Sequence, residues 1–557
     1  MNLKLETLNF STFSRPELLT KLRTNRFDVL VIGGGITGAG IAVDAAARGL
    51  KTALIEKNDF AFGTSSRSTK LIHGGLRYLK QLEFALVKEV GSERAIVHKL
   101  APHLVVPEKM LLPLYEKRGL GYWLTSLGLK IYDWLAGVKP EDQRRMLTKL
   151  QTLHYEPLVK MDDIKGGAIY AEYRTDDARL TIEIAKLAFA KGAVVLNYIR
   201  AVDFIYMNEM VAGVQALDEV SGERVAIKAS VVVNAAGPWV DELRDINHSK
   251  DNKYLHLTKG VHIVVPYHRL PVRQAIYFDV PDGRMIFAIP RGRVTYIGTT
   301  DTDYTGEKDK VFTSKEDARY LMDAVNETFP STYLTLADIE SSWAGLRPLI
   351  HEAGKSASEL SRKDEIFESS SGLISIAGGK LTGYRKMAER VVDLITKKEE
   401  FNDRTLGPCS TDSIYLAGAG LKTVKEVNAY CHDIADRIES LGLKGDDAAY
   451  LVHLYGKQAE SIIEYASSHP KSDPEIDLAM AELWFAVHHE MIWKAEDFLM
   501  RRTGLLFFNM PRLFHIKESV LRMMAQYFSW SDERIREENQ GMEQMIEQTL
   551  KFKNEMN

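Results

Sequence analysis

The clearest pattern near the amino end is a short apolar run, a glycine-rich turn and a second apolar run. Residues 27–32 (FDVLVI) suit a buried parallel strand, because apolar and β-branched residues follow one another almost without a break. Residues 36–48 are rich in alanine and predict a helix that Gly49 ends. Residues 51–55 predict a second strand that finishes at Glu56. This order predicts one complete βαβ unit.

The middle of the chain has a different pattern, in which short strand-like segments alternate with polar turns. Gly, Pro and Asp-Gly residues separate these segments, as expected of a mixed β sheet. The expected strands cover residues 194–196, 201–205, 211–217, 224–227, 230–233, 261–265, 274–278, 284–289 and 295–297. We expect this sheet to form a wall over a bound ligand.

The last third of the chain changes pattern again. Residues 373–377 predict one more buried strand, which enters a Gly-Gly turn and a helix. Beyond about residue 400, Glu, Lys, Ala and Leu dominate and strand-like runs become rare. The tripeptide 406–408 (LGP) is the expected boundary of a separate helical part.

Composition narrows the classes of function. The chain has 557 residues, of which 45% are hydrophobic and 27% are charged, as in folded soluble proteins. A formal net charge of -4 gives no electrostatic footprint for nucleic acid. Only Cys409 and Cys431 occur, so a disulfide framework or cysteine metal site is unsupported and a reducing compartment is expected. Without a signal-peptide pattern or a run of about 18 apolar residues, we expect a protein in the cytoplasm, or lying on a membrane without crossing it.

Three glycines between the first strand and helix form a G-x-G-x-x-G pattern. They are Gly33, Gly35 and Gly38, and Gly34 lies inside the same turn. Such glycines permit a tight turn, close approach of a pyrophosphate, and packing of the helix on the strand. Glu56 ends the next strand, where an acid can accept hydrogen bonds from ribose hydroxyls. The context predicts a dinucleotide site. The loop does not distinguish NAD from FAD, and the acid disfavours NADP.

Two later turns favour FAD. Residues 231–239 are a buried strand that breaks at Ala236 and Gly237, and residues 374–380 repeat the arrangement at Gly378 and Gly379. Small residues let the backbone approach a bulky ligand, and the second turn again precedes a helix. We therefore predict an α/β chain with a Rossmann-like FAD-binding domain over residues 27–400. An inserted mixed or antiparallel β substrate domain lies mainly within 85–200 and 245–345, and an α-helical C-terminal domain covers 401–557.

Several segments, taken in order, strongly resemble the FAD-dependent glycerol-3-phosphate dehydrogenases. They are residues 62–78 (FGTSSRSTKLIHGGLRY), 259–262 (KGVH), 297–301 (IGTTD), 343–349 (WAGLRPL), 378–385 (GGKLTGYR) and 495–503 (AEDFLMRRT). The resemblance covers nearly the whole chain. One departure is Gly383, where many members have threonine, and we expect it to alter local packing more than chemistry.

The resemblance implies a glutathione-reductase-like FAD fold that oxidises sn-glycerol 3-phosphate to dihydroxyacetone phosphate. Reduced flavin then passes electrons to a membrane quinone, from a position on the inner face of the cell membrane. The resemblance also implies which residues bind the cofactor, in addition to Glu56, Ala236 and the glycines named above. They are Lys57, Thr64, Ser65, Ser66, Lys70, His73, Gly74, Gly75, Leu381 and Thr382.

The same motifs suggest the substrate site. Arginine suits a phosphate, and Arg77, Arg347 and Lys380 are expected to bind the substrate phosphate and hydroxyls, with Arg362 as a looser candidate.

His262 is the expected general base for the hydroxyl proton, because imidazole titrates near working pH, and the less favoured alternative is a packed core residue. Lys380 could serve as the base instead, or stabilise the developing alkoxide. Tyr78 is expected to hydrogen-bond substrate or flavin. Residues 488–490 (HHE) lack the spacing of a metal site, so no metal is predicted.

A membrane quinone as electron acceptor requires a surface that contacts the membrane, and two segments are candidates for it. Residues 122–137 (YWLTSLGLKIYDWLAG) place Trp123, Leu127, Ile131, Trp134 and Leu135 on one helical face, which fits either an interfacial helix or a core helix. Residues 505–508 (LLFF) are a weaker candidate. Alternatives to the quinone-linked dehydrogenase are a glycerol-3-phosphate oxidase using oxygen, an amine or amino-acid oxidase, and a non-catalytic flavin sensor. Self-association as a homodimer through the helical domain is a further hypothesis.

Overall fold

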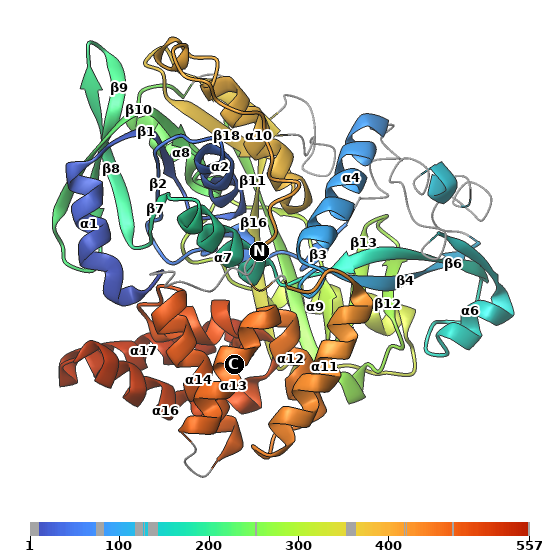
Figure 1. Cartoon of the computed structure of the whole chain (residues 1–557). Coiled ribbons are helices and arrows are strands. Elements are labelled where there is room, and N and C mark those ends of the chain that lie inside the picture. The colour runs from blue at the N-terminus through green and yellow to red at the C-terminus, as the bar shows by residue number, and fades with distance from the viewer. Residues whose placement is uncertain are drawn as a thin grey trace.

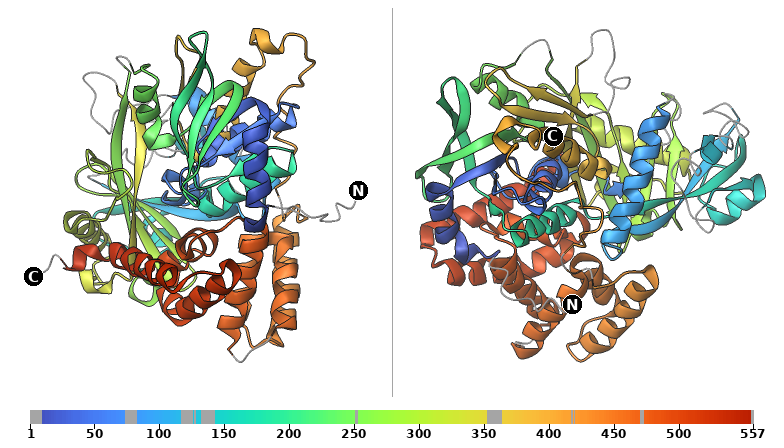
Figure 2. Two further views of the ribbon diagram at one scale, coloured as in Figure 1. Left: turned by 90° about the vertical axis from the view of Figure 1, so that its left-hand side faces the viewer. Right: turned by 45° about the horizontal axis from the view of Figure 1, so that its top comes forward.

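The computed structural model describes residues 10–73, 83–116, 126, 128–131, 143–250, 253–351, 364–416, 418, 420–469 and 473–554. In these segments two sheets lie side by side above a layer of C-terminal helices (Figure 1). The helical layer stays on the same side of both sheets when the molecule is turned by 90° (Figure 2).

The first sheet carries the predicted βαβ unit. Its order is β17 (Asp364–Glu368), β18 (Ile374–Gly378), β10 (Arg224–Asn234), β1 (Arg26–Ile32), β2 (Thr52–Ile55) and β7 (Val194–Leu196). Pairing is parallel from β18 to β7, while β17 is antiparallel. The hairpin of β8 (Ile199–Met207) and β9 (Met210–Asp218) extends from β10. The helices of this part are α1 (Arg15–Thr24), α2 (Ile36–Ala47), α7 (Asp177–Ala190), α8 (Val240–Ile246) and α10 (Tyr384–Ile395).

One expectation about this sheet is wrong. Residues 224–227 and 230–233 are not two strands but parts of the single strand β10. Its first half pairs antiparallel with β9, whereas its second half pairs parallel with β1. Lys228 and Ser230, the polar residues between the two apolar runs, lie near the point where the strand changes its partner and are not part of a turn.

The second sheet is mixed. Its order is β15 (Thr302–Asp303), β11 (Leu255–Pro266), β14 (Val294–Gly298), β13 (Met285–Arg291), β12 (Ala275–Asp279), β4 (Val106–Tyr115), β6 (Ile164–Arg174) and β3 (Leu71–Ile72), with β16 (Ser341–Ile350) on β11 and β5 (Arg145–Thr148) on β6. The associated helices are α4 (Phe84–Leu100), α6 (Lys149–Tyr155) and α9 (Lys315–Thr328).

Alternation along β11 separates the two faces of this sheet. Val261, Ile263 and Val265 pack in one core with α9, while Val264 joins a second core shared with the C-terminal helices. Because side chains alternate along a strand, His262 lies on the same face as Val264. This face also borders the cavity described below.

No strand occurs among the described residues of the carboxyl-terminal part, which is helical apart from its connecting segments. It contains α11 (Val424–Glu439), α12 (Gly445–Tyr455), α13 (Ala459–Ser468), α14 (Pro474–His489), a π-helix (Asp497–Arg502), α15 (Leu505–Phe508), α16 (Met510–Phe528), α17 (Asp532–Thr549) and α18 (Lys551–Asn554). Leu505, Leu506 and Phe507 are buried in the core against the second sheet, so this candidate membrane surface is interior packing. Of residues 122–137, only 126 and 128–131 are described. No helix in the described part of the chain combines the length and apolar character needed to span a bilayer.

A buried ion network joins α7 to the C-terminal helices. Arg179 Nη2 lies 2.5 Å from Glu490 Oε1, Lys186 Nζ lies 3.5 Å from the same oxygen, and all three side chains are nearly inaccessible. Burial alone raises the pKa of the Glu490 carboxyl, but Arg179 and Lys186 outweigh it and lower that pKa to about 2. The folded state therefore depends on a charged Glu490 between two helices that are distant in sequence.

We expect Glu490→Gln to lower the free energy of unfolding by about 3 kcal/mol at pH 7, because it removes one of the two carboxylates, Glu183 being the other, that compensate the buried charges of Arg179 and Lys186. The folded pKa lies below the ordinary value of 4.5, so the stabilisation is present above pH 4.5 and is lost as the pH falls toward 2. Denaturant titrations from pH 7 to acid pH will measure the difference, which should shrink on acidification. The exposed Glu439→Gln on α11 is the control. An equal effect of both variants at pH 7 would contradict the assignment.

Candidate functional site

The glycine turn lies where the backbone of β1 meets that of β10. Gly33 has φ of 118°, and a Cβ there would lie 2.5 Å from the carbonyl oxygen of Ala235. A Cβ on Gly38 would lie 1.9 Å from the carbonyl oxygen of Gly33. Only glycine fits these positions, and α2 begins directly behind the turn. The amino end of α2 therefore lies at the end of the sheet, which is the position of a phosphate site.

Glu56 ties the second strand to this turn. Its Oε2 accepts a hydrogen bond from the Gly34 N–H at 2.7 Å, and its Oε1 accepts one from the Asn58 N–H at 2.9 Å. Burial raises the pKa of this carboxyl, and the two N–H donors oppose that shift. Each oxygen retains a further lone pair, and the side chain borders the cavity. Beside it, Lys57 Nζ lies 4.2 Å from the ring centre of Trp239.

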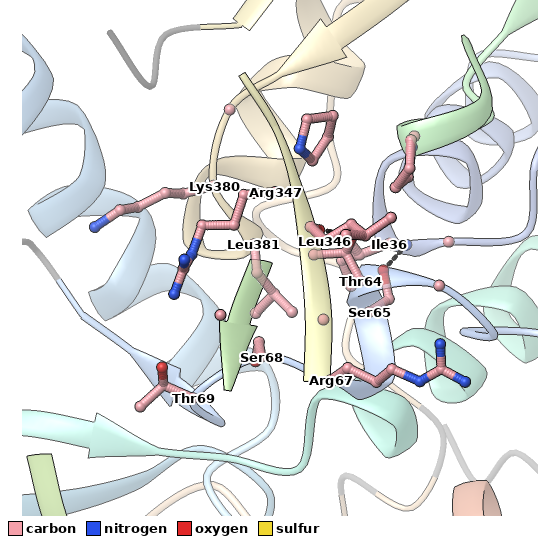
Figure 3. Close-up of a pocket in the computed structure, with 18 of the residues that line it drawn as sticks. Ile36, Thr64, Ser65, Arg67, Ser68, Thr69, Leu346, Arg347, Lys380 and Leu381 are labelled. Carbon is pink, nitrogen blue, oxygen red and sulfur yellow. Dashed lines mark hydrogen bonds between the residues drawn. The ribbon is translucent and has the colours of Figure 1, made fainter. Parts of the chain in front are cut away.

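A cavity of about 1930 Å³ opens at this end of the first sheet and continues beneath the second. Pockets for single small ligands usually measure ~300–1,000 Å³. The cavity is therefore large enough for an extended dinucleotide together with a small substrate. Figure 3 shows part of its wall, with Ile36, Thr64 and Ser65 near the turn and Arg347, Lys380 and Leu381 on other elements.

Most residues expected to bind the cofactor line this cavity. They are Gly33, Gly35, Glu56, Lys57, Thr64, Ser65, His73, Ala236, Gly237, Gly378, Gly379, Leu381 and Thr382. The Ser65 hydroxyl accepts a hydrogen bond from the Ile36 N–H at 3.0 Å, directly at the amino end of α2. Thr64 donates to the carbonyl oxygen of Leu346 at 2.6 Å and so joins the turn to β16.

Other predicted cofactor residues lie away from the cavity wall. Gly34 and Gly38 shape the turn from behind, and Ser66 is buried. Lys70 Nζ lies 2.5 Å from Asp177 Oδ1 and donates to the carbonyl oxygen of Ser66 at 3.1 Å, with only 2% of its side chain exposed. The charge of Lys70 is thus neutralised within the protein. Gly74 and Gly75 are outside the described residues.

His262 is buried on the cavity side of β11. Its ring stacks on Trp343 of β16 with centroids 4.7 Å apart, and its Nε2 lies 3.0 Å from Thr69 Oγ1. Among the described residues Nδ1 has no hydrogen-bond partner. Burial lowers the pKa of this imidazole well below 6.5, and the nearby cations Arg347 and Lys70 lower it further. The ring is therefore neutral at pH 7 and able to accept a proton.

Arg347 lies on the neighbouring strand opposite Thr258, and its guanidinium extends over Gly260 toward Thr299. Its guanidinium donates to Thr299 Oγ1 at 2.9 Å and to the Thr300 carbonyl and Asp301 Oδ1, both at 3.1 Å. A Cβ on Gly260 would lie 2.3 Å from Nη2, so this glycine provides the space that Arg347 occupies.

Lys380 follows the Gly378–Gly379 turn, whose two residues have φ of 78° and 76°. Arg347 and Lys380 both line the cavity and appear on one side of β16 in Figure 3. The remaining substrate candidates Arg77, Tyr78 and Arg362 are outside the described residues.

Thr69 and Arg67 are among the site residues that the sequence did not single out. Thr69 contacts His262, and Arg67 lines the cavity on the other side of β16 from Arg347 (Figure 3). Burial, together with the charge of Arg501, lowers the pKa of Arg67 to about 10, so it is still charged at pH 7. Both belong to the segment 62–78, but nothing in their spacing separates them from its other polar residues. Among the described residues no three His, Cys, Asp or Glu side chains are placed to hold a metal ion.

Comparison with known proteins agrees with this geometry. Residues 28–385 match the model of the FAD dependent oxidoreductase family, and residues 409–535 match the C-terminal domain of alpha-glycerophosphate oxidase. The aerobic glycerol-3-phosphate dehydrogenase of Staphylococcus aureus (strain bovine RF122 / ET3-1) is 48% identical over 543 residues, which is 97% of each chain.

Solved structures show the same relationship. The glycerol-3-phosphate dehydrogenase from Bacillus halodurans complexed with FAD is 44% identical, with a TM-score of 0.83 over 97% of this chain and 98% of that one. The L-alpha-glycerophosphate oxidase from Mycoplasma pneumoniae, 19% identical with a TM-score of 0.54 over 67% of this chain and 96% of that one, shares the fold.

These matches confirm the predicted fold class, an α/β FAD-dependent oxidoreductase fold with a helical C-terminal domain, and confirm the cofactor FAD. The matches cover both parts of the chain, and 48% identity over 97% of the chain establishes the family. The chain belongs to the FAD dependent oxidoreductases and, within them, to the family of aerobic glycerol-3-phosphate dehydrogenases.

Proposed function

We propose that this protein oxidises sn-glycerol 3-phosphate to dihydroxyacetone phosphate and transfers the hydride to FAD. The observation that carries the proposal is that a neutral, buried His262 and the cation Arg347, from adjacent strands, line one cavity. The names of the relatives in Staphylococcus aureus and Bacillus halodurans support the same substrate. When bound, FAD supplies the acceptor for the hydride.

The residues of the chain then handle the proton and the phosphate. His262 takes the proton of the substrate hydroxyl, because its ring is neutral at pH 7 and borders the cavity. The cation that forms on the ring is stabilised by the phosphate dianion, which offsets the nearby positive charges. Arg347 and Lys380 bind that phosphate or the developing alkoxide, and Arg77, Tyr78 and Arg362 complete the substrate site.

The residues of the first sheet fit the cofactor. The Gly33–Gly38 turn and the α2 amino end would hold the pyrophosphate, and Glu56 would accept hydrogen bonds from the adenosine ribose. The turns at Ala236–Gly237 and Gly378–Gly379 let the backbone approach the flavin, with Leu381 and Thr382 beside it.

Electrons leave to a quinone in the membrane, with the protein on the inner face of the cell membrane and residues 122–137 as the contact. The name of the Staphylococcus aureus relative, a dehydrogenase, supports this acceptor, whereas the match of residues 409–535 to an oxidase domain keeps oxygen as the second candidate. Assembly as a homodimer through the helical domain belongs to the same proposal.

The first test is reduction of bound FAD in the absence of oxygen. We expect sn-glycerol 3-phosphate to bleach the visible flavin absorbance, and a soluble quinone to restore it faster than dissolved oxygen does. Rapid-mixing spectrophotometry measures both half-reactions. Bleaching by glycine or a D-amino acid but not by sn-glycerol 3-phosphate would refute the substrate. Fast oxygen-dependent recovery with hydrogen peroxide would assign the oxidase activity.

His262→Gln should slow flavin reduction by about 10²–10⁴-fold, the usual contribution of a general base. The base must be unprotonated, and its pKa lies well below 6.5. At low substrate concentration, where the rate reports the ionisation of the free protein, the reduction rate of the parent protein should therefore stay constant from pH 8 through 6.5 and fall only at lower pH. The exposed His268→Gln is the control and should leave the rate unchanged. A parent rate that falls already between pH 8 and 7 would exclude His262 as the base.

Gly38→Ala should yield protein without bound FAD. The added methyl would lie 1.9 Å from the Gly33 carbonyl oxygen, a backbone atom that cannot move without opening the turn. The ratio of flavin to protein absorbance after purification measures the loss. Gly541→Ala on α17, where a Cβ meets nothing within 4 Å, should retain the cofactor. Full flavin content in Gly38→Ala would show that this turn does not hold FAD.

A further inference from the structure

The segment 495–503 (AEDFLMRRT) is one of the motifs that carry the family resemblance, but none of its residues has a role in the proposed reaction. In the structure Asp497–Arg502 form a π-helix in which every residue is buried. A π-helix is rare and commonly marks a functional position, because it costs stability relative to an α-helix. Three routes, each a chain of side-chain contacts, connect this π-helix with the end of the first sheet where the cofactor would bind.

The first route runs through Asp59. Arg501 Nε lies 2.6 Å from Asp59 Oδ2, and Arg502 donates to both carboxylate oxygens at 2.7 and 2.9 Å. All three side chains are at most 1% exposed. Burial raises the pKa of the Asp59 carboxyl, but the Arg502 and Arg501 guanidiniums outweigh it and hold that pKa at about 2. Asp59 is therefore a charged anchor for the turn that follows β2.

That turn begins with Glu56, the residue placed against the adenosine ribose. Within it, Asn58 donates its N–H to Glu56 Oε1, and the Asn58 carbonyl accepts the Tyr198 N–H at 2.9 Å. Asn197 Nδ2 donates to Asp59 Oδ1 at 3.1 Å. The position of Glu56 is thus set by a turn whose far end is held by two arginines of the C-terminal helices.

The second route runs through Asp497. Its Oδ1 accepts the Tyr198 hydroxyl at 2.7 Å and Arg501 Nη2 at 2.6 Å. Its Oδ2 accepts the N–H groups of Trp493 and Lys494, both at 2.8 Å. Tyr198, Trp493 and Lys494 all line the cavity. One buried carboxylate therefore fixes three parts of the cavity wall.

The third route is aromatic. The Arg501 guanidinium lies 5.7 Å from the ring centre of Phe62, and that of Arg67 lies 5.2 Å from it. Phe62 and Arg67 both line the cavity, next to Lys57 and Trp239. Arg501 therefore touches the cavity wall as well as the anchor.

We propose that the π-helix of the C-terminal domain is a clamp for the adenosine half of FAD, with Arg501 and Arg502 as positioning residues. Neither arginine lines the cavity. They act by fixing the Glu56 turn, Tyr198 and Phe62 in the arrangement that receives the cofactor. The inference rests on the FAD dependence of the family and not on the proposed substrate or acceptor.

The clamp is tested by titrating apoprotein with FAD and following flavin fluorescence. Arg501→Lys keeps the charge but cannot bridge Asp59 and Asp497 at once, and Arg502→Lys cannot reach both oxygens of Asp59. We expect each variant to bind FAD at least about tenfold more weakly, equivalent to about 1.4 kcal/mol. At saturating FAD, kcat should return to within about twofold of the parent value, since no catalytic group is changed.

Arg512→Lys provides the matched control. Arg512 is also a buried arginine of the helical domain, 3.4 Å from Asp447 and 3.8 Å from Glu482, but its partners do not line the cavity. We expect this variant to lower thermal stability without changing FAD affinity. Unchanged FAD affinity in both Arg501→Lys and Arg502→Lys would overturn the proposal, as would an equal loss of affinity in Arg512→Lys.

If the arginine variants do not fold, Tyr198→Phe removes only the hydroxyl bound to Asp497. It should weaken FAD binding about threefold or more, the effect of one hydrogen bond, and unchanged affinity would again overturn the clamp. FAD titration requires neither substrate nor acceptor, so its failure is separate from failure of the proposed reaction.

Discussion

The parallel pairing of β1 between β2 and β10 is the constraint on which the rest of the structure depends. Ile32 lies opposite both Ile55 and Asn234, and β10 in turn pairs Val233 with Ile374 of β18. Because parallel strands end at the same edge of the sheet, the turns that follow them meet there. The Gly33 turn, Glu56, Ala236–Gly237 and Gly378–Gly379 are therefore neighbours although they come from four parts of the chain.

The electrostatics of the cavity divide along its length. Arg347 and Lys380 place positive charge on the cavity wall, while burial together with the charges of Arg347 and Lys70 keeps His262 neutral. In the function proposed above, this arrangement suits an anionic substrate that must lose a proton, because the substrate brings the negative charge that His262 needs once it is protonated. Lys70 is buried behind the cavity wall and paired with Asp177, and its positive charge also lowers the pKa of His262.

The helical domain is more than a neighbour of the catalytic part. Two buried ion pairs connect it to the part of the chain that carries the first sheet. Glu490 of the helical domain pairs with Arg179, and Arg502 of the helical domain pairs with Asp59. Buried ion pairs are costly to desolvate and so contribute little net stability, but they strongly penalise any arrangement that separates them. Such an interface fixes one relative placement of the two parts, which is what a shared cavity wall requires.

How much could be predicted from the sequence varies along the chain. The βαβ unit, Glu56 and the two later small-residue turns follow from local patterns, because strand and helix periodicity and glycine turns are encoded within a few residues. The division of β10 into two strands was wrong, since only its two different partners show that it is continuous. The segment 62–78 was identified, but not that Lys70 faces Asp177 while Arg67 faces the cavity.

The sequence by itself determined the dinucleotide fold, the cofactor class and the family, because these rest on motifs that keep their spacing. Only the tertiary structure decided which charges are paired with each other and which border the cavity. Asp59 and Arg501 are 442 positions apart, and the neutral state of His262 depends on burial by β16 and on Arg347. Charge pairing and desolvation are properties of the packed molecule, so no local pattern could have revealed them.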